Sequence, residues 1–273
     1  MTTPSFTTLA VHQDGAVAHI QLNRPDKSNA LNAAMWQEIR AAFEWVDQSP
    51  TIRVALLSGA GKNFCAGIDL AMLAGVQQQT AHPDGARSRE KLRRLILDLQ
   101  DCLSSLERCS KPVIAAIQGA CVGGALDLVT CCDMRYVTDD AVFSIKEIDI
   151  GMVADVGTLQ RLPRLIGDGM TRELAYTGRN VEADEAVRLG LANRNFGTAE
   201  ALTVGVQALA AEIAGKSPLA IRGSKEILNY SRDHSVADGL NYVATWNAAM
   251  LISADLQESM QAKLEKRAPR FAD

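Results

Sequence analysis

The order of apolar and polar residues divides the chain into a first half that mixes strands with helices and a second half that is almost entirely helical. Apolar runs and alternating stretches predict short strands, beginning with a hairpin around Asp14-Gly15. Apolar residues three and four positions apart predict helices, including a long amphipathic one through Leu92 and Leu106. The expected strands lie at 7–22 (two strands), 54–57, 113–117, 134–137 and 141–145. The other expected helices lie at 32–47, 125–132, 158–166, 170–177, 183–189, 199–214, 218–231 and 236–264.

The first half repeats a strand–strand–helix rhythm. This repeated order of elements favours an α/β fold of stacked ββα units over a doubly wound sheet. Residues 75–87, GVQQQTAHPDGAR, are polar and contain Pro and Gly, so we expect a mobile loop there. We divide the chain into a core at 1–200 and a helical region at 201–273, which could cover a site or contact a neighbouring subunit.

Composition and charge exclude several classes of partner. Hydrophobic residues make up 47% of the 273 positions and charged residues 22%, as in ordinary globular proteins. The net charge of −4 and the lack of a basic aromatic stripe argue against nucleic acid, and no apolar run is long enough to cross a membrane. No lysine or arginine precedes Arg24 and the C-terminus APRFAD carries no peroxisomal tripeptide, so we expect a cytoplasmic protein.

Common metal and nucleotide motifs are missing from the sequence. The six cysteines form no CxxC pair and are expected to be buried thiols, and the four histidines form no HExxH motif, so no metal is expected. The stretch at 59–63 is not a phosphate loop, because Leu56 and Asn63 stand where the motif needs Gly and Ser or Thr.

Three acidic residues in an apolar, glycine-rich segment indicate proton chemistry. Asp127 is the only charged residue between Lys111 and Asp133, and burying an unpaired carboxylate would cost several kcal/mol and raise its pKa. Glu147 and Asp155 follow 20 and 28 residues later. A sequence that places three acids here is expected to use them.

Each acid also has a purely structural alternative. Asp127 could complement a helix N-terminus, Glu147 could pair with Lys146, although neighbours on a strand face opposite ways, and Asp155 could be an N-cap. These alternatives stay open at the level of sequence.

Two glycine-bearing turns are candidates for binding an anion. The segment FCAGIDL at 64–70 precedes one helix, and Gly123-Gly124 precedes another. Unpaired backbone N–H groups at helix N-termini attract negative charge, so two such turns aimed at one point would hold an oxyanion. The alternative is that both are simply tight turns.

Several of these motifs resemble the crotonase (enoyl-CoA hydratase/isomerase) superfamily. The segment from Lys111 to Gly167, RPDKSNALN near residue 24 and FCAGIDL near residue 64 occur in that family's order. The resemblance runs from about residue 8 to 200. It implies a spiral of ββα units with a C-terminal helical region that forms trimers or pairs of trimers.

Within the superfamily, the acids are most similar to those of the Δ3,5-Δ2,4-dienoyl-CoA isomerases. Hydratases carry two glutamates 20 residues apart and a glycine eight residues further on, whereas this chain has Asp127, Glu147 and Asp155. One departure is Ala125, where the family often has a third glycine. The resemblance implies isomerisation of 3,5-dienoyl-CoA to 2,4-dienoyl-CoA in the β-oxidation of unsaturated fatty acids. Hydration of a 2-enoyl-CoA is the main alternative, and a non-catalytic scaffold is another.

The resemblance also assigns expected roles. Glu147 would take the C2 proton while ionised, Asp155 would deliver a proton at C6, and Asp127 would orient the site. The amides of Ile68 and Gly124 would form the oxyanion hole. No metal or redox cofactor is implied, and CoA belongs to the substrate. Residues expected to contact the substrate are Arg24, Lys27, Ala30, Ala66, Gly67, Ile68, Asp69, Leu70 and Gly124, with Arg24 and Lys27 as candidates for the CoA phosphates.

Overall fold

A computed structural model describes residues 2–273 as two small sheets surrounded by helices. The larger sheet is parallel except for an antiparallel hairpin at one edge, and the smaller sheet pairs two parallel strands and one antiparallel strand. In spatial order the larger sheet contains β1 (Leu9–Asp14), β2 (Val17–Leu22), β3 (Val54–Gly59), β4 (Val113–Ile117), β6 (Met134–Val137) and β9 (Arg194–Asn195). The smaller sheet contains β5 (Ala120–Val122), β7 (Val142–Ser144) and β8 (Val181–Glu182).

Helices cover both faces of the larger sheet. Along β3 and β4 successive side chains point to opposite faces, and both faces are buried. One face packs in the main core with α1 (Ala33–Gln48) and α3 (Gly85–Arg108), while the other packs on α8 (Ala199–Ala214). The strands are therefore nearly continuous apolar runs, which is why the sequence pattern identified them.

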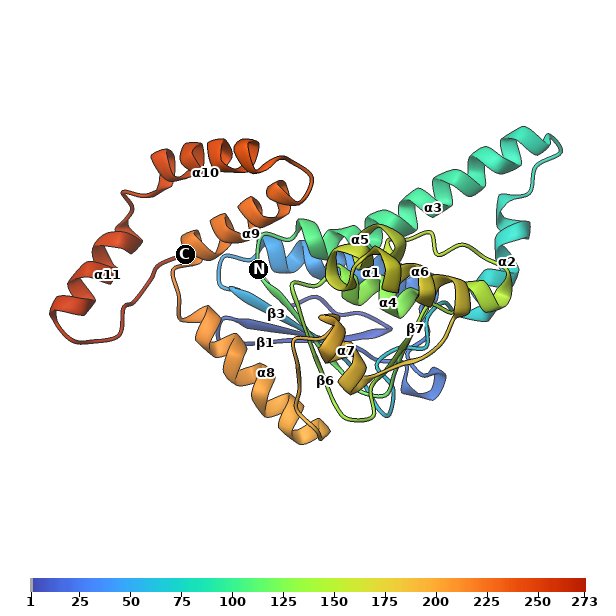
Figure 1. The fold of residues 1–273 in the computed structure, drawn as a ribbon, viewed down its shortest axis with the longest axis horizontal. Helices are drawn as coiled ribbons and strands as arrows, with labels where there is room; N and C mark the ends of the chain where they lie inside the picture. Colours follow the sequence, from blue (N-terminus) through green and yellow to red (C-terminus); the bar gives the residue numbers. More distant parts are fainter. Residues whose placement is uncertain (1) are drawn as a thin grey trace.

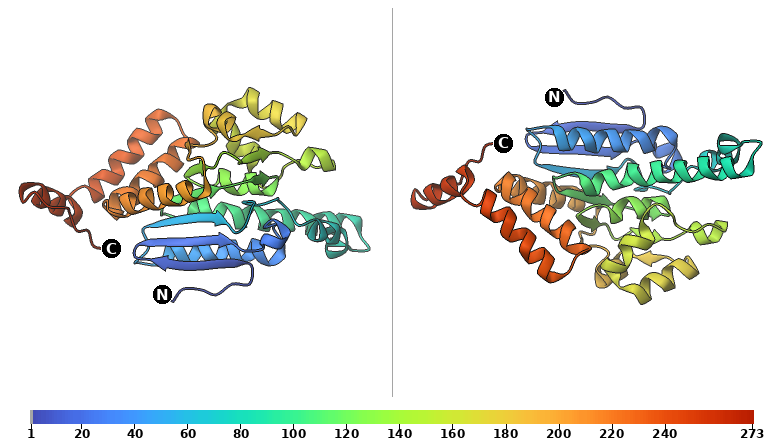
Figure 2. Two further views of the ribbon diagram at one scale, coloured as in Figure 1. Left: turned by 90° about the horizontal axis from the view of Figure 1, so that it is seen from below. Right: turned by 90° about the horizontal axis from the view of Figure 1, so that it is seen from above.

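The remaining helices surround this core, with the C-terminal ones projecting away from it (Figure 1). In all three views α10 and α11 lie at the opposite end of the molecule from α2 and the outer end of α3 (Figures 1 and 2). These helices are η1 (Pro25–Lys27), α2 (Leu70–Thr80), α4 (Gly124–Thr130), η2 (Glu147–Ile150), α5 (Thr158–Ile166), α6 (Asp168–Thr177), α7 (Ala183–Leu189), α9 (Pro218–Arg232), α10 (Val236–Met250) and α11 (Ala254–Leu264).

The expectation of a mobile loop at 75–87 is wrong. α2 continues to Thr80 and α3 begins at Gly85, so only residues 81–84 connect the two helices. Ala, Met, Leu and Gln are good helix formers, which outweighs the polar composition of this stretch. Asp84 caps α3 by accepting a hydrogen bond of 2.8 Å from the Ala86 N–H, so the turn chemistry marks a helix start.

Two other sequence-based expectations also need correction. The single helix expected at 236–264 is two helices, because Ser253 caps a new helix by accepting from the Leu256 N–H at 3.2 Å. The short strands β5, β8 and β9 were not expected, since two or three residues carry too little pattern to be recognised.

Two further structural observations concern the cysteines and the helices. All six cysteines are free and buried, as expected from the sequence. None of the helices in the described part of the chain has the length and apolar character needed to cross a bilayer.

Candidate active site

The segment before α2 runs along the small strand β5, which brings the two glycine-bearing turns together. Cys65 and Cys121 form a parallel bridge, and the Phe64 N–H donates to the Gln118 carbonyl at 2.8 Å. Gly67 follows with a φ of +89°, and a Cβ at this position would lie 2.6 Å from the Val122 carbonyl oxygen. Only glycine permits this approach.

The amides of Ile68 and Gly124 lie next to each other. A Cβ built on Gly124 would be 3.7 Å from the Ile68 nitrogen, and one built on Gly67 would be 3.3 Å from the Gly124 nitrogen. Neither amide donates a hydrogen bond to any group in residues 2–273. Gly124 is the first residue of α4, whereas Ile68 precedes α2, which begins at Leu70. Two free N–H groups at one point can receive an oxyanion.

Glu147 lies beside this pair of amides. Its Oε1 is 3.1 Å from the position of a Cβ on Gly123, whose φ of +56° bends the chain between β5 and α4. The pairing of Glu147 with Lys146 is wrong, because Lys146 pairs with Asp149 at 3.0 Å and Glu147 opens η2 instead of lying on a strand.

The carboxylate of Glu147 is suited to exchanging protons near neutral pH. Burial, reinforced by the negative charge of Asp127, raises the pKa of Glu147 to about 7. Its Oε2 is buried and has no hydrogen-bond partner within residues 2–273. A buried polar atom without a partner is rare and often marks a place where a ligand binds.

Asp127 is fully buried and connects α4 to α5. Its Oδ1 accepts a hydrogen bond of 2.5 Å from the Thr158 N–H at the start of α5, while Oδ2 has no partner among the described residues. Asp127 therefore complements the N-terminus of a different helix from its own. Burial raises the pKa of Asp127 to about 6; the Thr158 hydrogen bonds oppose this rise, Asp155 adds to it and Arg161 also opposes it.

Asp155 lies near the other two acids on the turn that leads into α5. The suggestion that Asp155 is an N-cap is wrong, because the N-cap of α5 is Gly157. The backbone carbonyl of Asp155 accepts from Gln100 Nε2 on α3 at 2.6 Å, which fixes the turn. Burial raises the pKa of the half-buried Asp155 side chain, and its negative charge also raises the pKa values of Asp127 and Glu147.

The two segments expected to hold CoA also lie together. The Ala66 N–H donates to the Ser28 carbonyl at 2.9 Å, and Arg24 pairs with Asp69 at 3.0 Å. Arg24 also donates to the Ala30 carbonyl, so its charge is already used within the protein. Lys27 is exposed and is the better candidate for a phosphate contact. Ala66 and Leu70 are exposed beside it.

Sequence reasoning missed residues that support the site from outside. Asn29 is fully buried in a left-handed conformation, and its amide donates to the Ala60, Asn63 and Phe64 carbonyls. A buried asparagine in a loop could have been suspected within the RPDKSNALN motif, because Asn tolerates positive φ. Arg161 was also missed; its position six residues after Asp155 on an amphipathic helix was the available signal.

Residues 2–273 contain no group of three or more His, Cys, Asp or Glu side chains arranged to hold a metal ion. This geometry does not test the expected absence of a metal, which stays a prediction.

Asp127→Asn is expected to stabilise the protein at pH 8. The folded state raises the pKa of Asp127 from 3.8 to about 6, so it holds the proton more tightly than the unfolded chain does. The resulting destabilisation is absent below about pH 4, grows as pH rises and is complete above about pH 6, where it amounts to roughly 3 kcal/mol. Asparagine keeps an acceptor for the Thr158 N–H. Urea unfolding at pH 5 and pH 8 measures the difference.

Asp26→Asn, at an exposed position, is the control for this experiment and should change stability equally little at both pH values. A loss of stability in Asp127→Asn that is the same at pH 5 and pH 8 would contradict the expectation, because it would mean that burial does not destabilise the carboxylate.

Comparison with known proteins agrees with this geometry. The sequence profile described as enoyl-CoA hydratase/isomerase matches residues 12–273. The chain belongs to the enoyl-CoA hydratase/isomerase family. The crotonase resemblance and the spiral ββα fold inferred from the sequence are thereby confirmed. The division into 1–200 and 201–273 stays a prediction.

Among members of this family, the chain is similar to proteins with two different activities in their names. The "Delta(3,5)-Delta(2,4)-dienoyl-CoA isomerase, peroxisomal" of Arabidopsis thaliana is 49% identical over 276 residues, covering 100% of this chain and 99% of the relative. The "Crotonyl-CoA hydratase" of Syntrophomonas wolfei is 34% identical, covering 98% of each. The isomerase is thus the more similar of these two, as the acids predicted. The expected cytoplasmic location stays a prediction.

Solved structures of the family share the fold over nearly the whole chain. An enoyl-CoA hydratase from Bacillus anthracis has a TM-score of 0.89 and 31% identity, covering 97% of this chain and 99% of that one. A putative enoyl-CoA hydratase from Thermobifida fusca, solved in complex with acetoacetyl-CoA, has a TM-score of 0.79 and 31% identity, covering 89% of this chain and 94% of that one.

Proposed function

We propose that this protein isomerises a 3,5-dienoyl-CoA to the 2,4-dienoyl-CoA. The observation that carries the proposal is the group of three interacting acids, Asp127, Glu147 and Asp155, beside the two free amides. The 49% identity to a relative named as a dienoyl-CoA isomerase supports the same reaction. The acetoacetyl-CoA complex of a family member supports an acyl-CoA thioester as the substrate.

The proposed mechanism moves one proton from C2 to C6. Glu147 takes the C2 proton, and the resulting negative charge on the thioester oxygen is held by the amides of Ile68 and Gly124. Protonation at C6 by Asp155 then shifts the two double bonds to C2–C3 and C4–C5. The proton removed at one end is balanced by the proton gained at the other. Asp155 afterwards recovers a proton and Glu147 releases one.

The protonation states required by this mechanism are Glu147 ionised and Asp155 protonated. Burial raises the pKa values of both residues, so the direction of the shifts alone does not separate the two groups in the substrate-free site. An acyl chain that displaces water from the half-buried Asp155 would raise its pKa further and favour its acid form. Substrate binding is therefore part of how the two roles are distinguished.

The position of Asp127 disfavours hydration. Its Oδ1 is occupied by the Thr158 N–H, and the short side chain holds the carboxylate close to α4. The hydratases that this chain resembles use two carboxylates to act on one water, and here the first of these two positions is Asp127, whose carboxylate is tied to the start of α5. We therefore propose that isomerisation exceeds hydration in this site.

No cofactor is needed for the proposed reaction, because it is redox-neutral. We propose that the CoA moiety lies along 24–30 and 66–70, with Lys27 near a phosphate.

We also propose a homotrimer or a dimer of trimers formed through the helical tail. Large apolar side chains on and beside α10 and α11, which are exposed in one chain, support this proposal. These include Val236, Leu240, Ile252, Met260 and Leu264. Sedimentation velocity would distinguish a monomer, a trimer and a hexamer.

The proposed function predicts which of two substrates one purified sample converts. With a 3,5-dienoyl-CoA, absorbance of the conjugated 2,4-diene should increase with time. With a 2-enoyl-CoA at the same concentration, loss of enoyl absorbance should be at least about 100-fold slower. Hydration would lack one of the two carboxylates that act on the water, and a general acid or base contributes about that factor. Faster loss of enoyl absorbance than gain of diene absorbance would instead identify a hydratase.

A further inference from the structure

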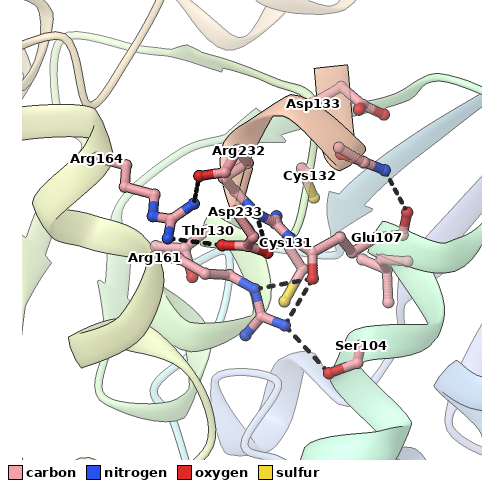
Figure 3. A network of polar contacts seen from close by, with 12 residues as sticks. Ser104, Glu107, Thr130, Cys131, Cys132, Asp133, Arg161, Arg164, Arg232 and Asp233 are labelled. Carbon is pink, nitrogen blue, oxygen red and sulfur yellow. Dashed lines mark hydrogen bonds and ion pairs between the residues drawn. The ribbon is translucent and has the colours of Figure 1, made fainter. Parts of the chain in front are cut away.

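Arg161 connects the turn that carries Asp155 to the long helix α3. Its guanidinium pairs with Glu107 at 2.9 Å and donates to Ser104 Oγ at 3.1 Å (Figure 3). Glu107 is also paired with Arg232 of α9, so the network joins three helices. The side chains of Arg161 and Glu107 are only 15% and 18% exposed, which makes this pair less screened than an ordinary surface pair.

The same guanidinium lies directly on Gly157. A Cβ built on Gly157 would be 1.9 Å from Arg161 Nη1, and the φ of Gly157 is +139°. Any other residue at this position would be strained and would displace Arg161. The Gly157 carbonyl accepts the Arg161 N–H at 3.0 Å. Arg161 thus holds the turn from both its backbone and its side chain.

Arg161 also acts on Asp127 electrostatically. The charges of Arg161 and Asp127 each shift the pKa of the other, and the other groups that shift the pKa of Asp127 are Thr158, through its hydrogen bonds, and Asp155. Arg161 itself is also influenced by Glu107 and Cys131. Arg161 is therefore the cationic side chain among the groups that shift the pKa of Asp127.

We propose that Arg161 is a positioning residue for the acid site: it holds the Asp155–Thr158 turn against α3 and so keeps the Thr158 N–H on the carboxylate of Asp127. This inference rests on the proposed function in so far as the three acids are the catalytic group. Its physical content, the placement of the turn and of the Thr158 hydrogen bond, can be measured without substrate.

Carbon-13 NMR of aspartate carboxyls tests the proposal in the full-length protein, with the Asp127 signal assigned through Asp127→Asn. Arg161→Met should raise the pKa of Asp127, because it loosens the Thr158 hydrogen bond and removes an opposite charge. Arg161→Lys keeps the charge and should restore most of that difference. Hydrogen exchange of the Thr158 amide should accelerate about tenfold in Arg161→Met, since the turn is no longer fixed.

Arg164→Met is the matched control, because Arg164 lies on the same helix, pairs with Asp233 and is not among the main groups that shift the pKa of Asp127. It should leave the pKa of Asp127 unchanged. If Arg161→Met does not fold, Arg161→Gln/Glu107→Gln removes both charges of the pair and should still raise the pKa of Asp127. Unchanged hydrogen exchange of the Thr158 amide in the folded Arg161→Met variant would overturn the proposal.

Activity provides an independent readout. With 3,5-dienoyl-CoA, Arg161→Met should lower kcat about tenfold or more and leave KM within about twofold, since Arg161 acts through the acids and lies outside the segments 24–30 and 66–70 proposed for CoA. If the wild-type protein does not isomerise dienoyl-CoA, the proposed function fails, yet a raised pKa of Asp127 in Arg161→Met still supports the role of Arg161.

Discussion

Glu147→Gln is expected to lower kcat for 3,5-dienoyl-CoA by about 10²–10⁴-fold, the usual contribution of a general base. Glutamine has nearly the same shape and can keep the contact with Gly123, so the loss reflects proton transfer and not packing. Because Glu147 must be ionised to take the C2 proton, kcat/KM of the wild type should fall as pH decreases through about 7, the pKa to which burial raises this residue.

Exchange of the C2 proton with solvent separates the role of Glu147 from a general loss of activity. In deuterium oxide the wild type should exchange this proton, whereas Glu147→Gln should not, and proton NMR of the CoA ester measures both. Asp149→Asn is the control, because Asp149 lies on the same short helix but is exposed and paired with Lys146. Normal exchange in Glu147→Gln would show that another group takes the C2 proton.

Sequence alone was sufficient for the parts of this fold and site that depend on local pattern. The apolar runs at β4 and β6 and the periodic helices α5 and α8 gave their bounds correctly, because buried strands and amphipathic helices leave strong signals. The isolated acid at Asp127 was visible as an anomaly for the same reason. The order of family motifs then led to the correct fold.

Interactions between distant residues were not predictable. Nothing local to Asp127 indicates that its side chain accepts from Thr158, 31 residues later, or that Arg161 pairs with Glu107, 54 residues earlier. The polar segment before α3 was misjudged because composition was allowed to outweigh helix propensity and the cap at Asp84. Such contacts are formed by the packing of whole elements, so they become visible only in three dimensions.

Asp155→Asn is expected to separate the two halves of the proposed reaction. Glu147 and the amides of Ile68 and Gly124 remain in place, so the C2 proton should still exchange with solvent at a rate close to that of the wild type. Delivery of a proton at C6 is lost, because asparagine has no acidic proton to give. Formation of the conjugated diene should therefore fall by about 10²–10⁴-fold, while the dissociation constant for a non-reacting acyl-CoA stays unchanged.

Asp168→Asn, at an exposed position on α6, is the control and should behave like the wild type in both assays. The two acid variants together decide the assignment, since Glu147→Gln should lose exchange and isomerisation whereas Asp155→Asn should lose only isomerisation. The opposite pattern, with exchange lost in Asp155→Asn and kept in Glu147→Gln, would reverse the two roles. Full isomerisation by Asp155→Asn would remove this residue from the mechanism, and with it the reason for preferring a transfer over four carbons.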